Sequence, residues 1–163
     1  MPPSLVQKYR RKGILVDANL LVVLLVGTLG PAHLTNCRAT KSFTPDDFSL
    51  LHRFVGEFQT LVTTPHILTE VSNLAGKLPQ PLLEQFRVMF SAIVKSLSEQ
   101  SRPAMDIALD AQFIKFGLTD TAITMIAPGR YLVLSDDLPL CRLLQRKNVD
   151  VINFNHIRTF GWT

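Results

Sequence analysis

The sequence of 163 residues is 47% apolar and 18% charged, which fits one domain with a substantial core and excludes an intrinsically disordered chain. Its most apolar run, residues 14–26, is interrupted by Asp17 and Asn19 and is too short to cross a bilayer, so we expect no membrane span. The net charge of +4 suits a polyanionic partner such as nucleic acid but does not identify one.

The first half of the chain predicts two strands separated by two helices. The run from Gly13 to Asp17 is continuously apolar before it ends in a polar residue, which is typical of a strand buried on both faces of a parallel sheet. Thr44 followed by Pro45 is a typical helix start, with a capping side chain and a proline in the first turn. In chain order we expect a basic tail over 1–12, a strand over 13–17, a buried helix over 18–26 ended by Gly27 and Gly30-Pro31, a loop over 33–42, a helix from Thr44 to Phe58 and a strand over 60–63.

The second half of the chain predicts further helices and two more strands. Thr64 and Pro65 again provide a capping side chain and a first-turn proline at the start of a helix, and Gly76 ends it. In chain order we then expect an amphipathic helix over 81–97, a helix or turn over 101–116 with Gly117 as its stop, a helix capped by Thr119 and running to Ala127, a strand over 131–135, a helix around 140–147 and a strand over 149–152.

This alternation of strands and helices predicts an α/β fold with a parallel sheet covered by helices on both faces. We therefore expect a three-layer α/β/α domain over residues 1–163 with a central sheet of four or five strands. Ligands of such sheets bind at the carboxyl ends of the strands. Asp17 ends the first strand, and Asp136 and Asp137 follow the third, so these acids are expected at one edge of the sheet.

Four acidic residues stand at the ends of elements or within apolar segments: Asp17, Glu70, Asp120 and Asp137. Each also has an ordinary explanation, as a helix cap, a solvated helix face, a first-turn acid or a turn residue. Gathered at one rim, these carboxylates would repel one another and raise one another's pKa unless cations were bound. Ligands that are all oxygen atoms favour Mg²⁺ or Mn²⁺ over zinc, and the sequence therefore predicts a site for a divalent metal ion.

Four short stretches resemble, in their order and spacing, the PIN-domain nucleases, which include ribonuclease toxins of the VapBC type. The stretches are Ile14–Asn19, Thr64–Val71, Gly117–Ile123 and Leu134–Leu138. The resemblance extends over nearly the whole chain and implies a three-layer α/β/α fold. It also implies acid-bound Mg²⁺ or Mn²⁺ that serves the hydrolysis of phosphodiester bonds.

The resemblance assigns candidate roles to seven positions of this sequence. In this resemblance Asp17, Glu70 and Asp120 match the first three metal-binding acids of the family. In the fourth stretch the family pattern favours Ser135 and Asp137 over Asp136, although the doubled acid leaves that choice open. Asn19 matches a polar position near the metal, with capping of the following helix as the alternative.

On these grounds we predict a metal-dependent endoribonuclease. Two alternatives stay open, a non-catalytic PIN-like module that binds RNA or protein and a DNA-directed nuclease of the same chemistry. The role of toxin in a toxin–antitoxin pair, with an antitoxin as partner, also stays open because the segment from Gly27 to Asp47 is longer than in the small toxins. A homodimer is a further open alternative.

The remaining residues that could carry chemistry are expected to be structural. Cys37 and Cys141 form no C-x-x-C pair, so we expect reduced thiols and a cytoplasmic protein. The four histidines (His33, His52, His66 and His156) show no metal-ligand spacing and are expected at the surface or in packing. A group of phenylalanines is expected in the core: Phe86, Phe90, Phe113 and Phe116.

Overall fold

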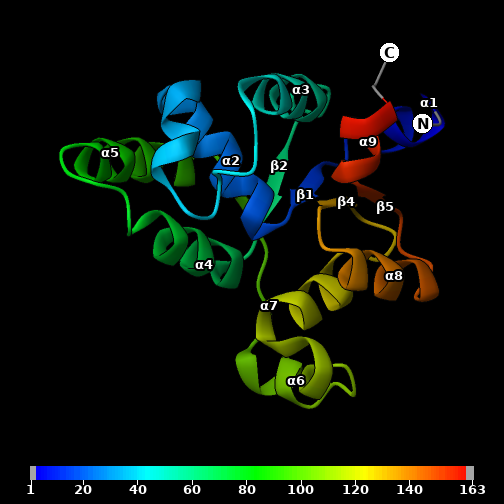
Figure 1. Cartoon of the computed structure of the whole chain (residues 1–163). Coiled ribbons are helices and arrows are strands. Elements are labelled where there is room, and N and C mark those ends of the chain that lie inside the picture. Colours follow the sequence, from blue (N-terminus) through cyan, green and yellow to red (C-terminus); the bar gives the residue numbers. More distant parts are fainter. Residues whose placement is uncertain (1–2, 161–163) are drawn as a thin grey trace.

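Five short parallel strands form the centre of the computed structural model, which describes residues 3–160 (Figure 1). The order across the sheet is β3-β2-β1-β4-β5, and every neighbouring pair is parallel. The predicted α/β class and parallel sheet are therefore confirmed, with five strands. The strands are β1 (Ile14–Val16), β2 (Leu61–Thr63), β3 (Ser98–Glu99), β4 (Leu132–Ser135) and β5 (Val151–Asn153).

Helices fill the connections between the strands, precede β1 and follow β5, and they cover both faces of the sheet. They are α1 (Pro3–Tyr9), α2 (Ala18–Leu29), the 3₁₀ helix η1 (Pro31–Asn36), α3 (Pro45–Val55), α4 (Pro65–Ala75), α5 (Leu82–Val94), α6 (Ala104–Ala108), α7 (Phe113–Ile126), α8 (Leu138–Arg146) and α9 (Phe154–Phe160). Because crossovers between parallel strands are right-handed, the connections that run toward β3 and those that return to β4 and β5 lie on opposite faces. Figure 1 shows α3 on one side of the sheet and α7 and α8 on the other, which confirms the three-layer arrangement.

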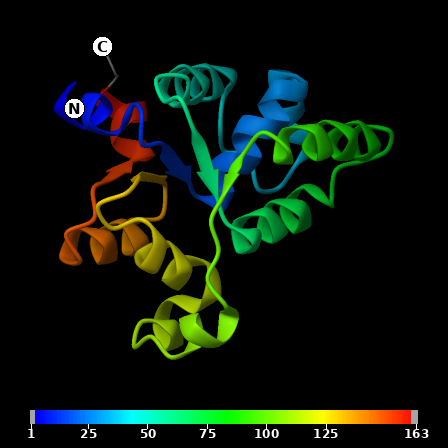
Figure 2. The ribbon, with the colours of Figure 1, turned by 180° about the vertical axis from the view of Figure 1, so that it is seen from behind.

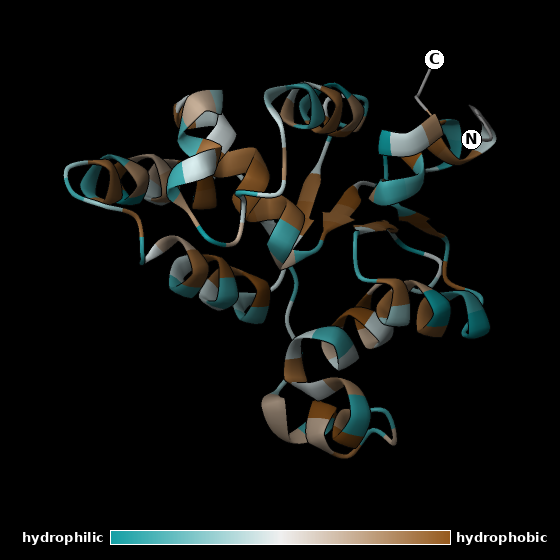
Figure 3. Ribbon diagram, in the orientation of Figure 1, coloured by the Kyte–Doolittle hydropathy of each residue, from teal (hydrophilic) through white to brown (hydrophobic). Residues whose placement is uncertain are grey.

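The core lies around β1 and α2, the two most apolar elements. All three residues of β1 are buried, and α2 buries residues on every side of the helix. A helix that is apolar all round must be enclosed, and α2 contacts η1, α3, α4 and α5. Figure 3 accordingly shows the hydrophobic colours on the strands and on the turns of α2 beside them. Among the described residues, no helix is long and apolar enough to cross a membrane.

The expected N-terminal tail differs from the structure, which has the helix α1 there. Tyr9 is buried, and Val6 packs beside it in the core. The hydroxyl of Tyr9 and the ammonium of Lys8 both donate to Oδ2 of Asp150, each at 2.7 Å. These contacts attach α1 to the segment that leads into β5. The basic residues of this region therefore belong to a helix that packs on the core and do not form a solvated tail.

Gly27 does not end α2, which continues to Leu29 and stops before Gly30. A Cβ atom on Gly27 would lie 2.2 Å from the ring of Phe48 on α3. The absent side chain thus allows two helices to approach closely, a packing role that is indistinguishable from a stop signal in the sequence.

Besides α1, three further elements were not expected from the sequence: β3, η1 and α9. The helix over 81–97 is shorter than predicted, since α5 ends at Val94 and the chain then forms β3 at the edge of the sheet. Figure 2 shows β3 beside β2 from behind. The expected loop over 33–42 begins with η1, and α9 follows β5 directly.

Gly117 produces a sharp kink inside α7. Its φ of 77° and ψ of −170° lie outside the helical region, so the residue stops the first turn of α7 as predicted. The second part of α7 then leaves in a new direction and carries Thr119 and Asp120. In both ribbon views, α6 and the start of α7 project from the rest of the molecule (Figures 1 and 2).

We predict that Gly117→Ala destabilises the domain by about 1–3 kcal/mol, because this backbone conformation is nearly exclusive to glycine. Urea unfolding followed by circular dichroism measures the change. Gly76→Ala is the matched control, since Gly76 has a right-handed helical backbone with φ of −61° and should change stability much less. Equal losses in both variants would show that the kink imposes no glycine requirement.

Candidate active site

The candidate site begins where β1 and β4 end side by side. Val16 is paired with Leu134, and the backbone N–H of Asp17 donates to the carbonyl oxygen of Leu134 at 3.0 Å, which extends the pairing by one step. The hydroxyl of Ser135 donates to Oδ2 of Asp17 at 2.6 Å. The connections leave β1 and β4 toward opposite sides, which makes this edge the switch point where α/β sheets bind ligands.

Asp17 is both a helix cap and a buried acid. Its Oδ1 accepts a hydrogen bond of 2.6 Å from the backbone N–H of Ala18 at the start of α2. Only 6% of the residue is exposed. The pKa of Asp17 is raised to about 6 because burial outweighs the hydrogen bonds from Ser135 and Ala18, which lower it. The capping explanation is therefore correct, but it leaves a carboxyl group whose charge is costly.

Asp137 is held by the same serine. Its backbone N–H donates to Oγ of Ser135 at 3.0 Å, and its Oδ1 accepts from the backbone N–H of Leu140 at 2.9 Å to cap α8. Asp137 lines the pocket that contains Asp17, whereas the side chain of Asp136 lines a neighbouring pocket. Of the doubled acids, Asp137 is thus the one grouped with the other candidate acids.

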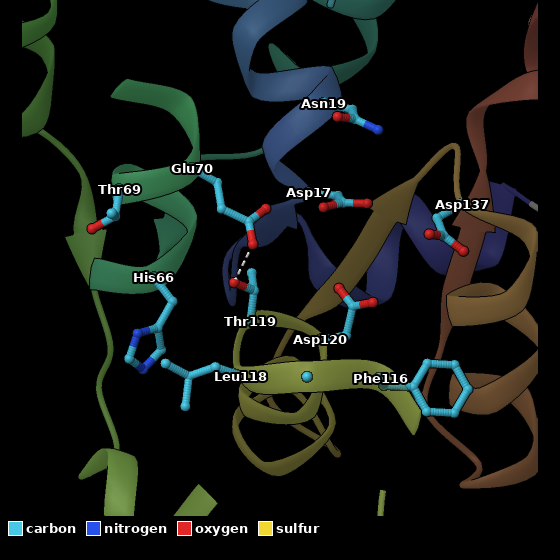
Figure 4. A pocket seen from close by; sticks show the side chains of 11 residues that line it. Asp17, Asn19, His66, Thr69, Glu70, Phe116, Leu118, Thr119, Asp120 and Asp137 are labelled. Carbon is cyan, nitrogen blue, oxygen red and sulfur yellow. Dashed lines mark hydrogen bonds between the residues drawn. The ribbon is translucent and has the colours of Figure 1, made fainter. Parts of the chain in front are cut away.

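Glu70 reaches the same pocket from α4. Thr119, buried in α7, donates from Oγ1 to Oε1 of Glu70 at 2.5 Å, and the dashed line in Figure 4 marks this bond. The prediction that Thr119 caps a helix is wrong, because Thr119 lies inside the helical part of α7 and its hydroxyl donates to a second helix instead. The contact between α4 and α7 therefore includes one of the predicted acids.

Asp120 is the acid whose pKa is raised by all three of the other pocket acids. Its pKa is raised to about 7, chiefly by burial and further by the negative charges of the other three acids, Asp17, Asp137 and Glu70. Among residues 3–160 no hydrogen bond to its carboxylate offsets this cost. Asp120 consequently carries the least compensated charge of the pocket.

The four predicted acids surround one pocket of about 460 Å³ at the carboxyl edge of the sheet (Figure 4). The structure thus brings together Asp17, Glu70, Asp120 and Asp137 as expected. Asn19 also lines the pocket, but the cap of α2 is Asp17 rather than Asn19.

Several lining residues were not predicted as part of the site. They are His66, Thr69, Phe116, Gly117, Leu118 and Thr119. His66 was expected at the surface or in packing, and its Nε2 is buried without a hydrogen-bond partner in the described part of the chain. Phe116 was expected in the core, yet it is only half-buried and lies at the rim of the pocket (Figure 4).

The donor set fits a hard divalent cation in its chemistry. The raised pKa values of Asp17 and Asp120 indicate negative charge that a cation would relieve. As placed within residues 3–160, however, no three His, Cys, Asp or Glu side chains form a ready-made metal-binding group. Mg²⁺ usually keeps several water ligands and needs only one or two direct carboxylates, so this pocket could hold it with part of the contacts made through water.

Comparison with known proteins does not identify a family. A scan against models of known protein families finds no match, and a search of curated proteins finds none either. The likeness to PIN-domain nucleases therefore rests on the four sequence stretches and stays a prediction.

We predict that the metal-free protein loses stability as the pH rises from about 4 to about 7. The pKa of Asp120 is about 7 in the folded protein against 3.8 ordinarily, and that of Asp17 is about 6. The folded state thus binds more protons than the unfolded chain in this window, so the free energy of unfolding falls as these protons leave. Urea unfolding in EDTA at several pH values measures this loss.

Asp120→Asn should remove part of that pH dependence. At pH 8 in EDTA we expect the variant to be more stable than the parent by about 1–2 kcal/mol, a figure reduced for the partial exposure of the group. Near pH 4 the gain should vanish. Glu99→Gln, which removes an exposed acid outside the pocket, is the control. A gain independent of pH would contradict the assigned charge repulsion.

Proposed function

We propose that this protein is a divalent-metal-dependent endonuclease that hydrolyses the phosphodiester bonds of single-stranded RNA. The observation that carries the proposal is the gathering of four carboxylates, from β1, α4, α7 and the start of α8, around one pocket at the switch point of the sheet. A scaffold protein has no need for such a costly arrangement, whereas metal-assisted phosphate chemistry depends on it.

In this proposal Asp17, Glu70, Asp120 and Asp137 hold Mg²⁺ or Mn²⁺ directly or through water. A bound ion of this kind supplies an activated water and neutralises charge on the phosphate. The protein's own contribution is to orient the acids. Ser135 holds Asp17 and the backbone of Asp137, and Asn19 offers an amide at the rim.

Thr119 has a comparable orienting role on the other side of the pocket. Its hydrogen bond fixes one carboxylate oxygen of Glu70 and leaves Oε2 as the oxygen available to a cation. Asp120, next in the chain, needs no such donor if the cation itself compensates its charge. The two residues of this turn would thus contribute a positioning group and a ligand.

The charge of the molecule supports a nucleic-acid substrate. With the four pocket acids set aside, the remaining chain has 17 basic and nine acidic residues, and such a basic body attracts phosphate backbones. Phe116 presents a half-buried ring at the pocket rim, where an unpaired base could stack. The preference for RNA over DNA rests on the resemblance to the PIN-domain nucleases.

The proposal extends to location and partners. Cys37 and Cys141 are both free and buried, which suits the reducing cytoplasm. An antitoxin is the protein partner that a toxin role would require, and a second copy of the chain is a further candidate partner. A neighbouring small gene for a DNA-binding protein would support the toxin–antitoxin role.

We predict that the purified protein cleaves single-stranded RNA with Mg²⁺ or Mn²⁺ and that EDTA abolishes the cleavage. Asp120→Asn should lower turnover by at least about 100-fold, since even groups behind the metal ligands contribute 10–100-fold. Binding of RNA should change much less, because the basic body supplies most of the attraction. Gel assays on a mixed RNA pool, with Glu99→Gln as control, measure turnover.

Three results would redirect the proposal. Equal cleavage by the parent and Asp120→Asn would indicate a contaminating nuclease. Binding of RNA without cleavage in any metal would favour the non-catalytic binding module. Faster cleavage of single-stranded DNA than of RNA at equal concentration would favour the DNA-directed nuclease.

A further inference from the structure

A second pocket adjoins the acidic one and carries the opposite charge. It has a volume of about 580 Å³, and its lining includes Arg38, Lys77 and Asn73. Asn19 lines both pockets, and Figure 4 shows it at the start of α2, next to Asp17. The two pockets are therefore neighbours that share one amide side chain.

Arg38 is placed by the long segment between α2 and α3. The thiol of the preceding residue, Cys37, donates to the carbonyl oxygen of Leu74 on α4 at 3.5 Å. The hydroxyl of Thr40 donates to the carbonyl oxygen of Leu34 at 2.6 Å and closes the turn that contains Arg38. These buried contacts hold the segment against α4, next to Asn73 and Lys77.

Neither cation of this pocket has a carboxylate partner in the described part of the chain. Arg38 and Lys77 are exposed, and no ion pair with either of them occurs within residues 3–160. Nearby Arg158, in contrast, is neutralised by Asp47, with an N–O distance of 2.8 Å. Unpaired charges at a concave surface are available to a ligand, which must then be an anion.

One acid, Asp136, also lines this pocket and reduces its positive charge. Its Oδ1 is buried without a hydrogen-bond partner among the described residues. Burial raises its pKa, while hydrogen bonds from its own backbone N–H and from the side chain of Asn19 oppose that rise. Two exposed cations thus face one half-buried acid, and the pocket still favours a single negative charge.

We propose that this second pocket binds the phosphate of a nucleotide next to the one that is cut, between Arg38 and Lys77. The inference rests on the proposed function. In the acidic pocket a cation can neutralise the scissile phosphate, but the flanking phosphates are repelled by the same carboxylates. The guanidinium of Arg38 and the ammonium of Lys77 offset that repulsion, and the amides of Asn19 and Asn73 add donors to phosphate oxygens.

The test compares two double variants in the Asp120→Asn background, which prevents cleavage during the measurement. Arg38→Gln with Lys77→Gln should weaken binding of a labelled single-stranded RNA by about 10-fold in fluorescence anisotropy. The slope of log affinity against log salt should fall by about 0.7, the value for one phosphate contact in single strands. The matched control is Lys12→Gln with Lys147→Gln, which removes the same charge at the amino edge of the sheet.

Two further measurements separate a phosphate contact from general attraction. In the protein with Asp120 intact, the Arg38→Gln, Lys77→Gln double variant should have a higher KM and a nearly unchanged kcat. An RNA with one neutral methylphosphonate beside the mapped cleavage site should bind the parent more weakly. In the Arg38→Gln, Lys77→Gln double variant, the same neutral linkage should not weaken RNA binding any further.

The outcomes distinguish this inference from the proposed function. Suppose that the Arg38→Gln, Lys77→Gln variant and the control variant weaken RNA binding equally while RNA is still bound and cut. This result would overturn the phosphate subsite alone. Failure of every protein to bind RNA would overturn the subsite and the proposed function together. A methylphosphonate penalty that persists in the double variant would assign the contact to other residues.

Discussion

The hydrogen bond from Ser135 to Asp17 is the contact on which the candidate active site depends. It joins the ends of β1 and β4, and the same hydroxyl accepts the backbone N–H of Asp137. A buried carboxylate is costly unless donors reach it, and here one serine orders two acids from adjacent strands. The other two acids then arrive from helices on either side of this fixed pair. The site is therefore built from the sheet outward, with its least compensated charge on Asp120.

The parts predictable from sequence were those with a strong local pattern. The apolar runs of β1 and β4 end in Asp17 and Ser135, and parallel topology alone brings such ends to one edge. The helix starts at Thr44 and Thr64 were equally clear, since both threonines cap their helices through side-chain hydrogen bonds. Convergence of the acids could be predicted because each sits at a defined place in one of these elements.

The parts not predictable depended on distant contacts. A two-residue strand such as β3 has no periodicity to detect, and its pairing comes from β2. The choice between Asp136 and Asp137 required the direction of each side chain after the strand. Gly27 carries a stop signal, but its function comes from the ring of Phe48. Phe116 is compatible with a core residue until the kink at Gly117 turns it to the rim.

The bond between Thr119 and Glu70 has a mechanical consequence. The sheet separates the layer containing α4 from the layer containing α7, and these layers meet beyond the carboxyl edge of the strands, at this bond. An ion held by Glu70, Asp120 and Asp17, in part through water, would link both layers to the sheet. Loading the pocket would then stiffen this edge of the molecule, and emptying it would leave the bond between Thr119 and Glu70 as a link between the two layers.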